Sequence, residues 1–194
     1  MNKWDQIFTT NPQYKPLNEI FLAELLEKIK KETNPNPKKM IDLGCGTAKT
    51  VLQFSKLGFE VTGLDNSIVA LKKLQEEIDN SKEQNITLIN ADLNNYNLTL
   101  EADIFLCNFV YAFIDNKEFF LKEVAECLRD DSVFILITPV IHKEIIYTEE
   151  DKTKIAVDFE ETLKLLKNIF SSVDVYHHDY IGTREDYVTF LIKK

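Results

Sequence analysis

The sequence contains few residues that cross-link a chain or interrupt its regular structure. Its 194 residues include 3 cysteines, 5 glycines and 5 prolines. Cys45, Cys107 and Cys127 form no CxxC pair and lie in apolar or glycine-containing stretches. These thiols are too few and too scattered for a disulfide framework, so we expect packed thiols in a reducing compartment. The sequence also has no internal repeat, no low-complexity tract and no Gly/Ser linker.

The sequence has neither a long apolar run nor an excess of positive charge. No stretch approaches the ~20 apolar residues that span a bilayer, and its first residues, MNKWDQIFTTNPQYK, lack the apolar core of a signal peptide. The formal net charge of −9 argues against a nucleic-acid-binding protein, because phosphate binding needs clustered Lys and Arg. We therefore expect a cytoplasmic protein with neither a membrane nor a nucleic acid as its partner. The sequence leaves the oligomeric state open.

What the sequence does contain is enough apolar material for one folded domain. Apolar residues make up 44% of the chain and charged residues 28%, which is typical of a globular protein. A length of 194 residues is the usual size of one domain. We therefore expect a single domain over residues 1–194.

The N-terminal segment differs from the rest in charge and pattern. The first 40 residues carry 7 basic and 5 acidic groups, although the whole chain is acidic. Apolar residues at three- and four-residue steps predict a helix over residues 17–31. Pro35 and Pro37 end it, since the residue before a proline avoids the helical conformation. We expect the arm and helix of residues 1–37 to cover the functional site.

After the prolines, short apolar strands alternate with amphipathic helices. Strands are predicted over 40–43, 59–64, 85–90, 102–107, 132–138, 172–178 and 186–192, and helices over 47–57, 67–78, 117–128 and 159–170. This alternation indicates an α/β fold, a doubly wound, mostly parallel sheet covered on both faces. The last two strands have only a short polar connection, so we expect them to pair antiparallel. Ligands bind such sheets outside the carboxyl ends of the strands.

The first strand ends in a glycine turn. Gly44 and Gly46 permit close approach of a ligand to bare backbone at a helix N-terminus. A dinucleotide-binding turn would read GxGxxG, but its sixth position is Lys49. Asp42, just before the glycines, would repel a pyrophosphate and suits a ligand that carries a cation. An ordinary glycine turn with a helix cap remains an equal alternative.

Acidic or amide side chains also end the next three strands. Asp65 lies about 20 residues beyond the glycine turn, where a carboxylate can accept both hydroxyls of a ribose; the alternative is a cap for the following helix. Asp92 can accept from the amine of an adenine, or it can simply shape a turn. Asn108 ends the fourth strand, and aromatic residues follow it. Of these aromatics, Phe109 and Phe113 are expected in the core more than Tyr111.

The run IDLGCGTA, followed by Asp65, Asp92 and Asn108, resembles the class I S-adenosylmethionine-dependent methyltransferases. The resemblance extends from about Met40 to the end of the chain, with a small-molecule, tellurite-resistance-like branch the most similar. It implies a Rossmann-like sheet of seven strands in the order 3-2-1-4-5-7-6, and S-adenosyl-L-methionine as the cofactor. The fourth strand lacks the proline-containing motif of enzymes that methylate amino groups of bases or glutamine, so that substrate class is disfavoured.

The same resemblance implies a role for each strand end. The glycine turn would approach the methionine part of the cofactor, the end of the second strand its ribose and the end of the third its adenine. The fourth strand's Asn108 would lie near the methionine amine and the transferred methyl group. The expected cofactor-binding residues are Asp42, Gly44, Cys45, Gly46, Asp65, Asn66, Asp92, Leu93 and Asn108.

The acceptor side is harder to predict. Tyr14, Tyr111 and His142 are candidates for contact with the acceptor, each with a packing or solvent-exposed role as the alternative. No catalytic residue is assigned, because a soft anionic acceptor needs no general base. No metal site is predicted, since the consecutive His177 and His178 point to opposite faces of a strand.

The hypothesis is therefore a methyltransferase that acts on a small molecule. Two alternatives remain: a methyltransferase whose acceptor is a protein or an RNA, and a regulatory subunit that binds the cofactor without turnover. An NAD-dependent oxidoreductase is less favoured because of Asp42 and Lys49.

Overall fold

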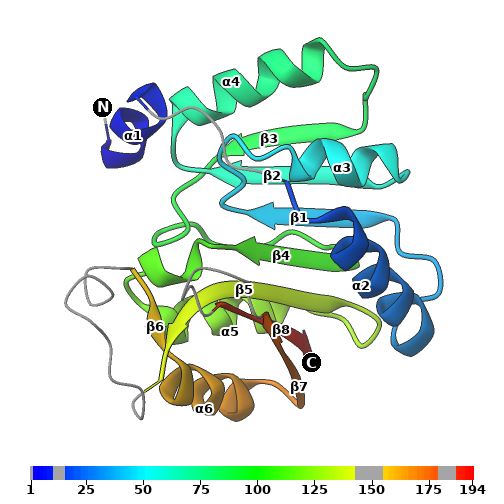
Figure 1. Ribbon diagram of the computed structural model, residues 1–194, viewed down its shortest axis with the longest axis vertical. Coiled ribbons are helices and arrows are strands. Elements are labelled where there is room, and N and C mark those ends of the chain that lie inside the picture. Colours follow the sequence, from blue (N-terminus) through cyan, green and yellow to red (C-terminus); the bar gives the residue numbers. More distant parts are fainter. Residues whose placement is uncertain (1, 11–15, 143–154, 179–186) are drawn as a thin grey trace.

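The sheet and its covering helices follow the predicted alternation. The computed structural model describes residues 2–10, 16–142, 155–178 and 187–194 (Figure 1). The helices are α1 (Lys3–Thr10), α2 (Glu19–Glu32), α3 (Thr50–Lys56), α4 (Ile68–Asp79), the short 3-10 helix η1 (Tyr111–Phe113), α5 (Lys117–Cys127) and α6 (Phe159–Ile169). The strands are β1 (Lys39–Leu43), β2 (Glu60–Asp65), β3 (Ile86–Asn90), β4 (Ile104–Asn108), β5 (Val133–Ile141), β6 (Val157–Asp158), β7 (Ser172–His178) and β8 (Tyr187–Lys193).

The sheet has the predicted strand order. Its main path is β3-β2-β1-β4-β5-β8-β7, with the first five strands parallel and β8 antiparallel to both of its neighbours. The expected order and antiparallel edge are thus confirmed. One strand was not predicted: the two-residue β6 pairs with the end of β5. The order reverses between β1 and β4, so their carboxyl ends form the switch point where such sheets bind ligands.

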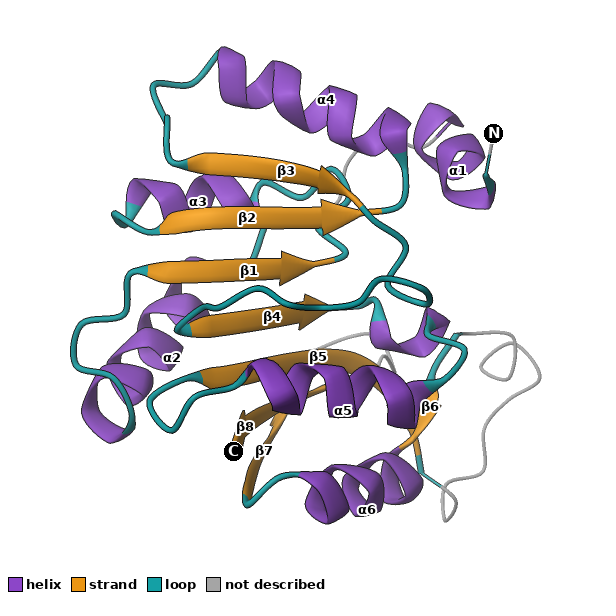
Figure 2. Ribbon diagram, turned by 180° about the vertical axis from the view of Figure 1, so that it is seen from behind, coloured by secondary structure: helices purple, strands orange, loops and turns teal. Residues whose placement is uncertain are grey.

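Each face of the sheet has its own core. One face packs against α2, α3 and α4, and the other against α5 and α6 (Figure 2). Neighbouring residues of β1 divide between them: Met40 belongs to the first core and Ile41 to the second, as strand alternation requires. The segment between β3 and β4 forms no helix, as expected from its length, and its Leu98 fills part of the second core.

The N-terminal arm contains a helix that was not predicted. Residues 3–10 form α1, which lies against α4 at the carboxyl end of the sheet (Figures 1 and 2). Asn2 and Asp5 cap its start reciprocally, since each backbone N–H donates to the other's side chain, at 3.2 and 2.7 Å. The predicted helix over residues 17–31 is confirmed as α2, capped by Asn18. In the described part of the chain, no helix is long and apolar enough to cross a membrane.

Candidate functional site

The glycine turn after β1 has the backbone that its sequence predicts. Gly44 and Gly46 have φ values of +87° and +51°, in the left-handed region that favours glycine. The amides of Gly44 and Cys45 both donate to the Leu64 carbonyl, at 2.7 and 2.9 Å. A Cβ on Gly44 would lie 2.4 Å from Cγ2 of Val110, which is closer than any real contact. Both the backbone angle and the packing therefore require glycine at this position.

Asp65 lies beside that turn and takes the capping role that was the alternative for it. Its Oδ2 accepts from the Gly46 amide and its Oδ1 from the Ser67 amide, both at 2.8 Å. Burial raises the pKa of Asp65, and the two amides oppose that rise. The carboxylate thus caps the chain entering α4 and is fixed against the glycine turn. Each carboxylate oxygen has lone pairs left for a ligand hydroxyl.

Asp42 is a second buried carboxyl under the same turn. Its side chain is 2% exposed. Burial, and after it the negative charge of Asp65, raises the pKa of Asp42 from 3.8 to about 7. Cys45 shares these surroundings, and burial likewise raises the pKa of its thiol. A buried acidic environment of this kind favours a cationic ligand and disfavours a phosphate.

The end of β3 is organised as a turn. Asp92 accepts from the Asn94 amide at 3.1 Å, and its own carbonyl accepts from the amides of Asn95 and Tyr96. These bonds give Asp92 the turn-forming role that was the alternative for it. Asp92 and Leu93 are both half-buried and end the strand next to Asp65, since Asn90 pairs with Asp65 in the sheet. Their contact with an adenine stays a prediction.

The end of β4 presents an amide with an open acceptor. The Oδ1 atom of Asn108 is buried and has no hydrogen-bond partner within the described chain. A buried oxygen without a partner is costly, so this atom is suited to accept from a ligand N–H. Asn66, at the end of β2, is also half-buried, and its carbonyl accepts from Asn2 Nδ2 at 2.7 Å.

The aromatic residues after β4 are arranged in the opposite way to the prediction. Tyr111 is completely buried in the core, whereas Phe109 is 43% exposed. Phe109 has a φ of +58°, and this turn of the backbone directs the two side chains to opposite sides. The Tyr111 hydroxyl is buried without a partner in the described residues. Tyr111 therefore belongs to the core beneath the site, and the packing alternative holds for it.

The other two acceptor candidates are placed differently. His142 follows β5 and its ring packs 4.8 Å from that of Phe159, centroid to centroid, so it remains a candidate. Tyr14 lies outside the described residues. The described part of the chain contains no cluster of three His, Cys, Asp or Glu side chains that could hold a metal ion.

Trp4 and Phe8, in the segment that was expected to cover the site, lie on the helix α1. The ring of Phe8, which is 4% exposed, would come within 3.0 Å of a Cβ on Gly46. Trp4 packs edge-on against Phe113, with 4.7 Å between centroids. Through these contacts α1 joins the glycine turn to the segment after β4. The Asn2/Asp5 capping pattern and the apolar spacing of Trp4 and Phe8 are the signals that could have revealed this helix.

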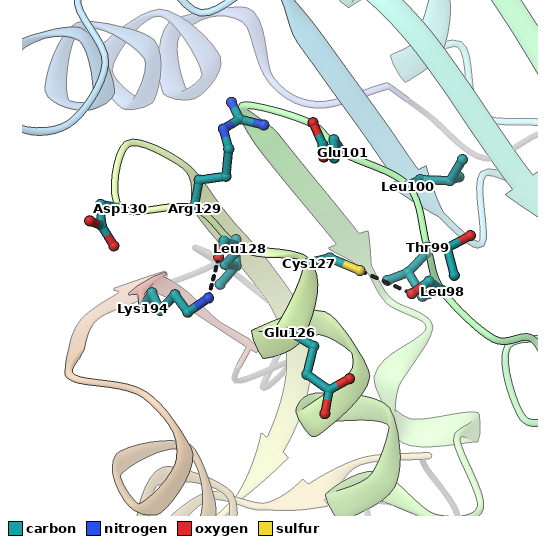
Figure 3. A pocket seen from close by; sticks show the side chains of 10 residues that line it. All are labelled: Leu98, Thr99, Leu100, Glu101, Glu126, Cys127, Leu128, Arg129, Asp130 and Lys194. Carbon is teal, nitrogen blue, oxygen red and sulfur yellow. Dashed lines mark hydrogen bonds between the residues drawn. The ribbon is translucent and has the colours of Figure 1, made fainter.

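A hollow of about 510 Å³ lies at the opposite end of the sheet (Figure 3). It is lined by the segment before β4, the loop between α5 and β5, and the C-terminal Lys194. Two polar groups at its wall bond to the chain itself: Cys127 Sγ donates to the Leu98 carbonyl at 3.1 Å, and Lys194 Nζ to the Leu128 carbonyl at 2.8 Å. This hollow is remote from the glycine turn and the switch point.

Comparison with known proteins agrees with this geometry. A family model described as "Methyltransferase domain" matches residues 35–186. The chain belongs to the methyltransferase domain family. The family expected from the IDLGCGTA run and the strand-end residues is thereby confirmed, and S-adenosylmethionine is the cofactor of this family.

The relatives are distant and most of them are longer. A carboxy-S-adenosyl-L-methionine synthase of Helicobacter pylori is 23% identical over 75% of this chain and 62% of its own length. A probable S-adenosyl-L-methionine-dependent methyltransferase, TehB, of Haemophilus influenzae is 32% identical over 42% of this chain and 28% of its own. The chain thus spans less than two thirds of these curated relatives.

Solved structures share the fold over nearly the whole chain. TehB of Haemophilus influenzae superposes with a TM-score of 0.70 at 17% identity, over 99% of this chain and 67% of that one. Phosphoethanolamine N-methyltransferase 2 of Haemonchus contortus, in complex with S-adenosyl-L-methionine, gives a TM-score of 0.76 at 13% identity, over 98% and 56%.

The residues at the switch point fit an adenosyl sulfonium ligand. The buried Oδ1 of Asn108 offers an acceptor that has no partner in the described chain, and the buried acidic surroundings of Asp42 and Asp65 suit a positive charge.

Proposed function

We propose that this protein is an S-adenosylmethionine-dependent methyltransferase that acts on a small molecule. The proposal is supported most by the set of acceptors at the switch point. Asp65 is fixed against the glycine turn by two amides, and the buried Asn108 Oδ1 has no partner in the described chain. A ribose and an amine are the ligand groups that would satisfy these two side chains.

Each residue has a role in binding and orienting the cofactor. Asp65 accepts from the ribose hydroxyls, Asn108 accepts from the methionine amine, and Asp42 supplies negative charge beneath the glycine turn. Asp92 and Leu93 border the adenine, with Asn66 beside the ribose. The cofactor supplies an electrophilic methyl group on a good leaving group, so the protein's main task is to align the acceptor with it.

The N-terminal segment closes the site in this proposal. α1 spans from the glycine turn to Phe113, and its aromatic rings exclude water from the region above Asp65. Aromatic faces also attract a sulfonium charge. The small-molecule acceptor is supported by the packing of α1 against the glycine turn and Phe113 and by the names of the TehB and carboxy-S-adenosyl-L-methionine synthase relatives. His142 is retained as a candidate acceptor contact.

The test separates binding from turnover. Calorimetry with S-adenosylmethionine, S-adenosylhomocysteine and NAD is expected to show binding of the two sulfur ligands and none of NAD. Incubation with methyl-labelled cofactor and a panel of thiols, amines, carboxylic acids and chalcogen oxyanions is then expected to label one class. Tight binding without any transfer would instead support a regulatory subunit, and transfer only to protein or RNA would reject the small-molecule acceptor.

A further inference from the structure

The first turn of α4 is held by a carboxylate from another helix. Asp5, on α1, is 6% exposed. Its Oδ1 accepts from the Ser67 hydroxyl at 2.8 Å and from the Val69 amide at 3.3 Å. The hydrogen bond from Ser67 lowers the pKa of Asp5, so the group that caps α4 from outside is a charged one. Negative charge at a helix N-terminus is favourable.

The capping residues of α1 contact two of the three residues in the turn that carries Asp65. Asp5 binds the Ser67 side chain, and Asn2 Nδ2 donates to the Asn66 carbonyl at 2.7 Å. Asn2 and Asp5 also hold one another through their reciprocal capping bonds. We call these two residues the α1 clamp. The clamp joins segments that lie more than 60 residues apart in the sequence.

The orientation of Asp65 depends on the same turn. Its Oδ1 accepts from the Ser67 amide and its Oδ2 from the Gly46 amide. A displacement of Ser67 therefore rotates or releases one side of the carboxylate. Binding groups lose much of their effect when they are misplaced by about 1 Å.

We propose that Asp5 is a positioning residue for ribose recognition, holding the turn of residues 65–67 so that Asp65 faces the ribose hydroxyls. The inference rests on the proposed function, in which Asp65 binds the ribose. Docking of α1 thereby raises the affinity for ligands that carry those hydroxyls, although Asp5 itself touches no ligand. If α1 only blocked the site, with Phe8 against Gly46, loosening α1 would instead raise the affinity for these ligands.

The experiment compares two ligands in calorimetric titrations of the full chain: S-adenosylhomocysteine and its 2′,3′-dideoxyribose analogue. Asp5→Ala is expected to weaken binding of S-adenosylhomocysteine about tenfold and of the analogue less than twofold. Asp5→Asn keeps an oxygen for Ser67 and is expected to restore most of the difference. Gln6→Ala, an exposed neighbour on the same helix, is the matched control and is expected to match the wild type.

Asn2→Ala provides a milder test in case Asp5→Ala does not fold. Asn2 is exposed, and its loss loosens the same clamp, so we expect about a threefold loss that is again restricted to the ribose-containing ligand.

Three results would overturn the inference alone, and a fourth would overturn the proposed function with it. Equal losses for both ligands would mean that Asp5 only stabilises the fold. Tighter binding by Asp5→Ala would mean that α1 obstructs the site. Unchanged affinity of Asp5→Ala for both ligands, in a protein whose wild type discriminates them, would remove the role of Asp5 and leave the proposed function intact. A wild-type protein that binds neither ligand would reject the proposed function itself, and the inference with it.

Discussion

The aspartates at the two ends of the sheet differ in their hydrogen bonding and in their electrostatic surroundings. At the amino end, Asp103 is saturated: its Oδ2 accepts from the amides of Lys38 and Lys39, at 2.7 and 2.8 Å, and its Oδ1 from Arg129 Nη2 at 2.7 Å and Asn34 Nδ2 at 3.2 Å. At the carboxyl end, Asp42 and Asp65 are buried close enough for the charge of Asp65 to raise the pKa of Asp42.

In the proposed function, this difference separates a structural end of the sheet from a ligand-binding end. The amino end ties β1, β4 and the start of β5 together with complete hydrogen bonds. The carboxyl end retains an acceptor without a partner in the described chain, two carboxyls of raised pKa and left-handed backbone. Costly features of this kind concentrate at functional sites.

The largest effect is expected from the pH dependence of stability that Asp42 causes. Its pKa rises from 3.8 to about 7 on folding. Below pH 4 the carboxyl is protonated in both states, so its burial as a charge does not lower the free energy of unfolding there. Between pH 4 and 7 the unfolded chain releases this proton and the folded chain retains it, so stability falls as the pH rises. The full cost above pH 7 is on the order of 4 kcal/mol. Urea denaturation of Asp42→Asn at several pH values is expected to show a flatter profile than the wild type.

Glu60→Gln, which removes an exposed carboxylate of β2, is the control and should keep the wild-type profile. The stability of Asp42→Asn is still expected to vary somewhat with pH, because burial also raises the pKa of Asp65. Identical profiles of stability against pH for Asp42→Asn and the wild type would show that folding does not raise the pKa of Asp42.

A steric test addresses the glycine turn. Gly44→Ala places a methyl group against Val110 in a left-handed conformation, so we expect a loss of about 3 kcal/mol in the free energy of unfolding. Gly58 has a similar φ of +90° but no atom within 4 Å of the added Cβ. Gly58→Ala is therefore expected to cost only about 1 kcal/mol. Equal costs would mean that packing against Val110 plays no part.

The saturated end is tested by Asp103→Ala. Four donors lose their acceptor, and we expect a loss of about 2–3 kcal/mol of stability with unchanged affinity for S-adenosylhomocysteine. Asp131→Ala removes the other, exposed partner of Arg129 and should cost less than about 0.5 kcal/mol. A change in ligand affinity in Asp103→Ala, measured on folded protein, would contradict the separation of the two ends.

The smallest effect is expected at Lys49, next to the glycine turn. Lys49 Nζ pairs with Glu77 at 2.9 Å, and both side chains are about 40% exposed. Lys49→Ala should change the stability by about 0.3 kcal/mol and leave ligand binding unchanged. A large loss of affinity would mean that Lys49 binds an anionic ligand group, which the acidic site disfavours.

The sequence allowed prediction of those parts that depend on local pattern. The alternation of strands and helices, the glycine turn and the placement of Asp42 and Asp65 at strand ends follow from short apolar runs with polar residues after them. The strand order came only from the resemblance to the methyltransferase family. The burial of the residues beyond β4 did not follow, because Phe109 has a positive φ that the sequence does not indicate, with Phe109 exposed and Tyr111 buried.

The contact between α1 and the turn after β2 could not be predicted from the sequence pattern. α1 has eight residues and only Asp5 and Phe8 are buried in it, so its helix depends on docking to α4. The bond between Asp5 and Ser67 spans 62 positions, and no local signal reports a contact at that separation.

The most direct measurement is the affinity for S-adenosylhomocysteine in two variants, one from each end of the sheet, determined by calorimetry beside their unfolding curves. If the carboxyl end binds the ligand and the amino end serves only stability, Asp65→Ala loses at least about tenfold in affinity. Asp103→Ala is then less stable but binds within about twofold of the wild type. Wild-type affinity in Asp65→Ala, or a specific loss of affinity in Asp103→Ala, would contradict this assignment of the two ends.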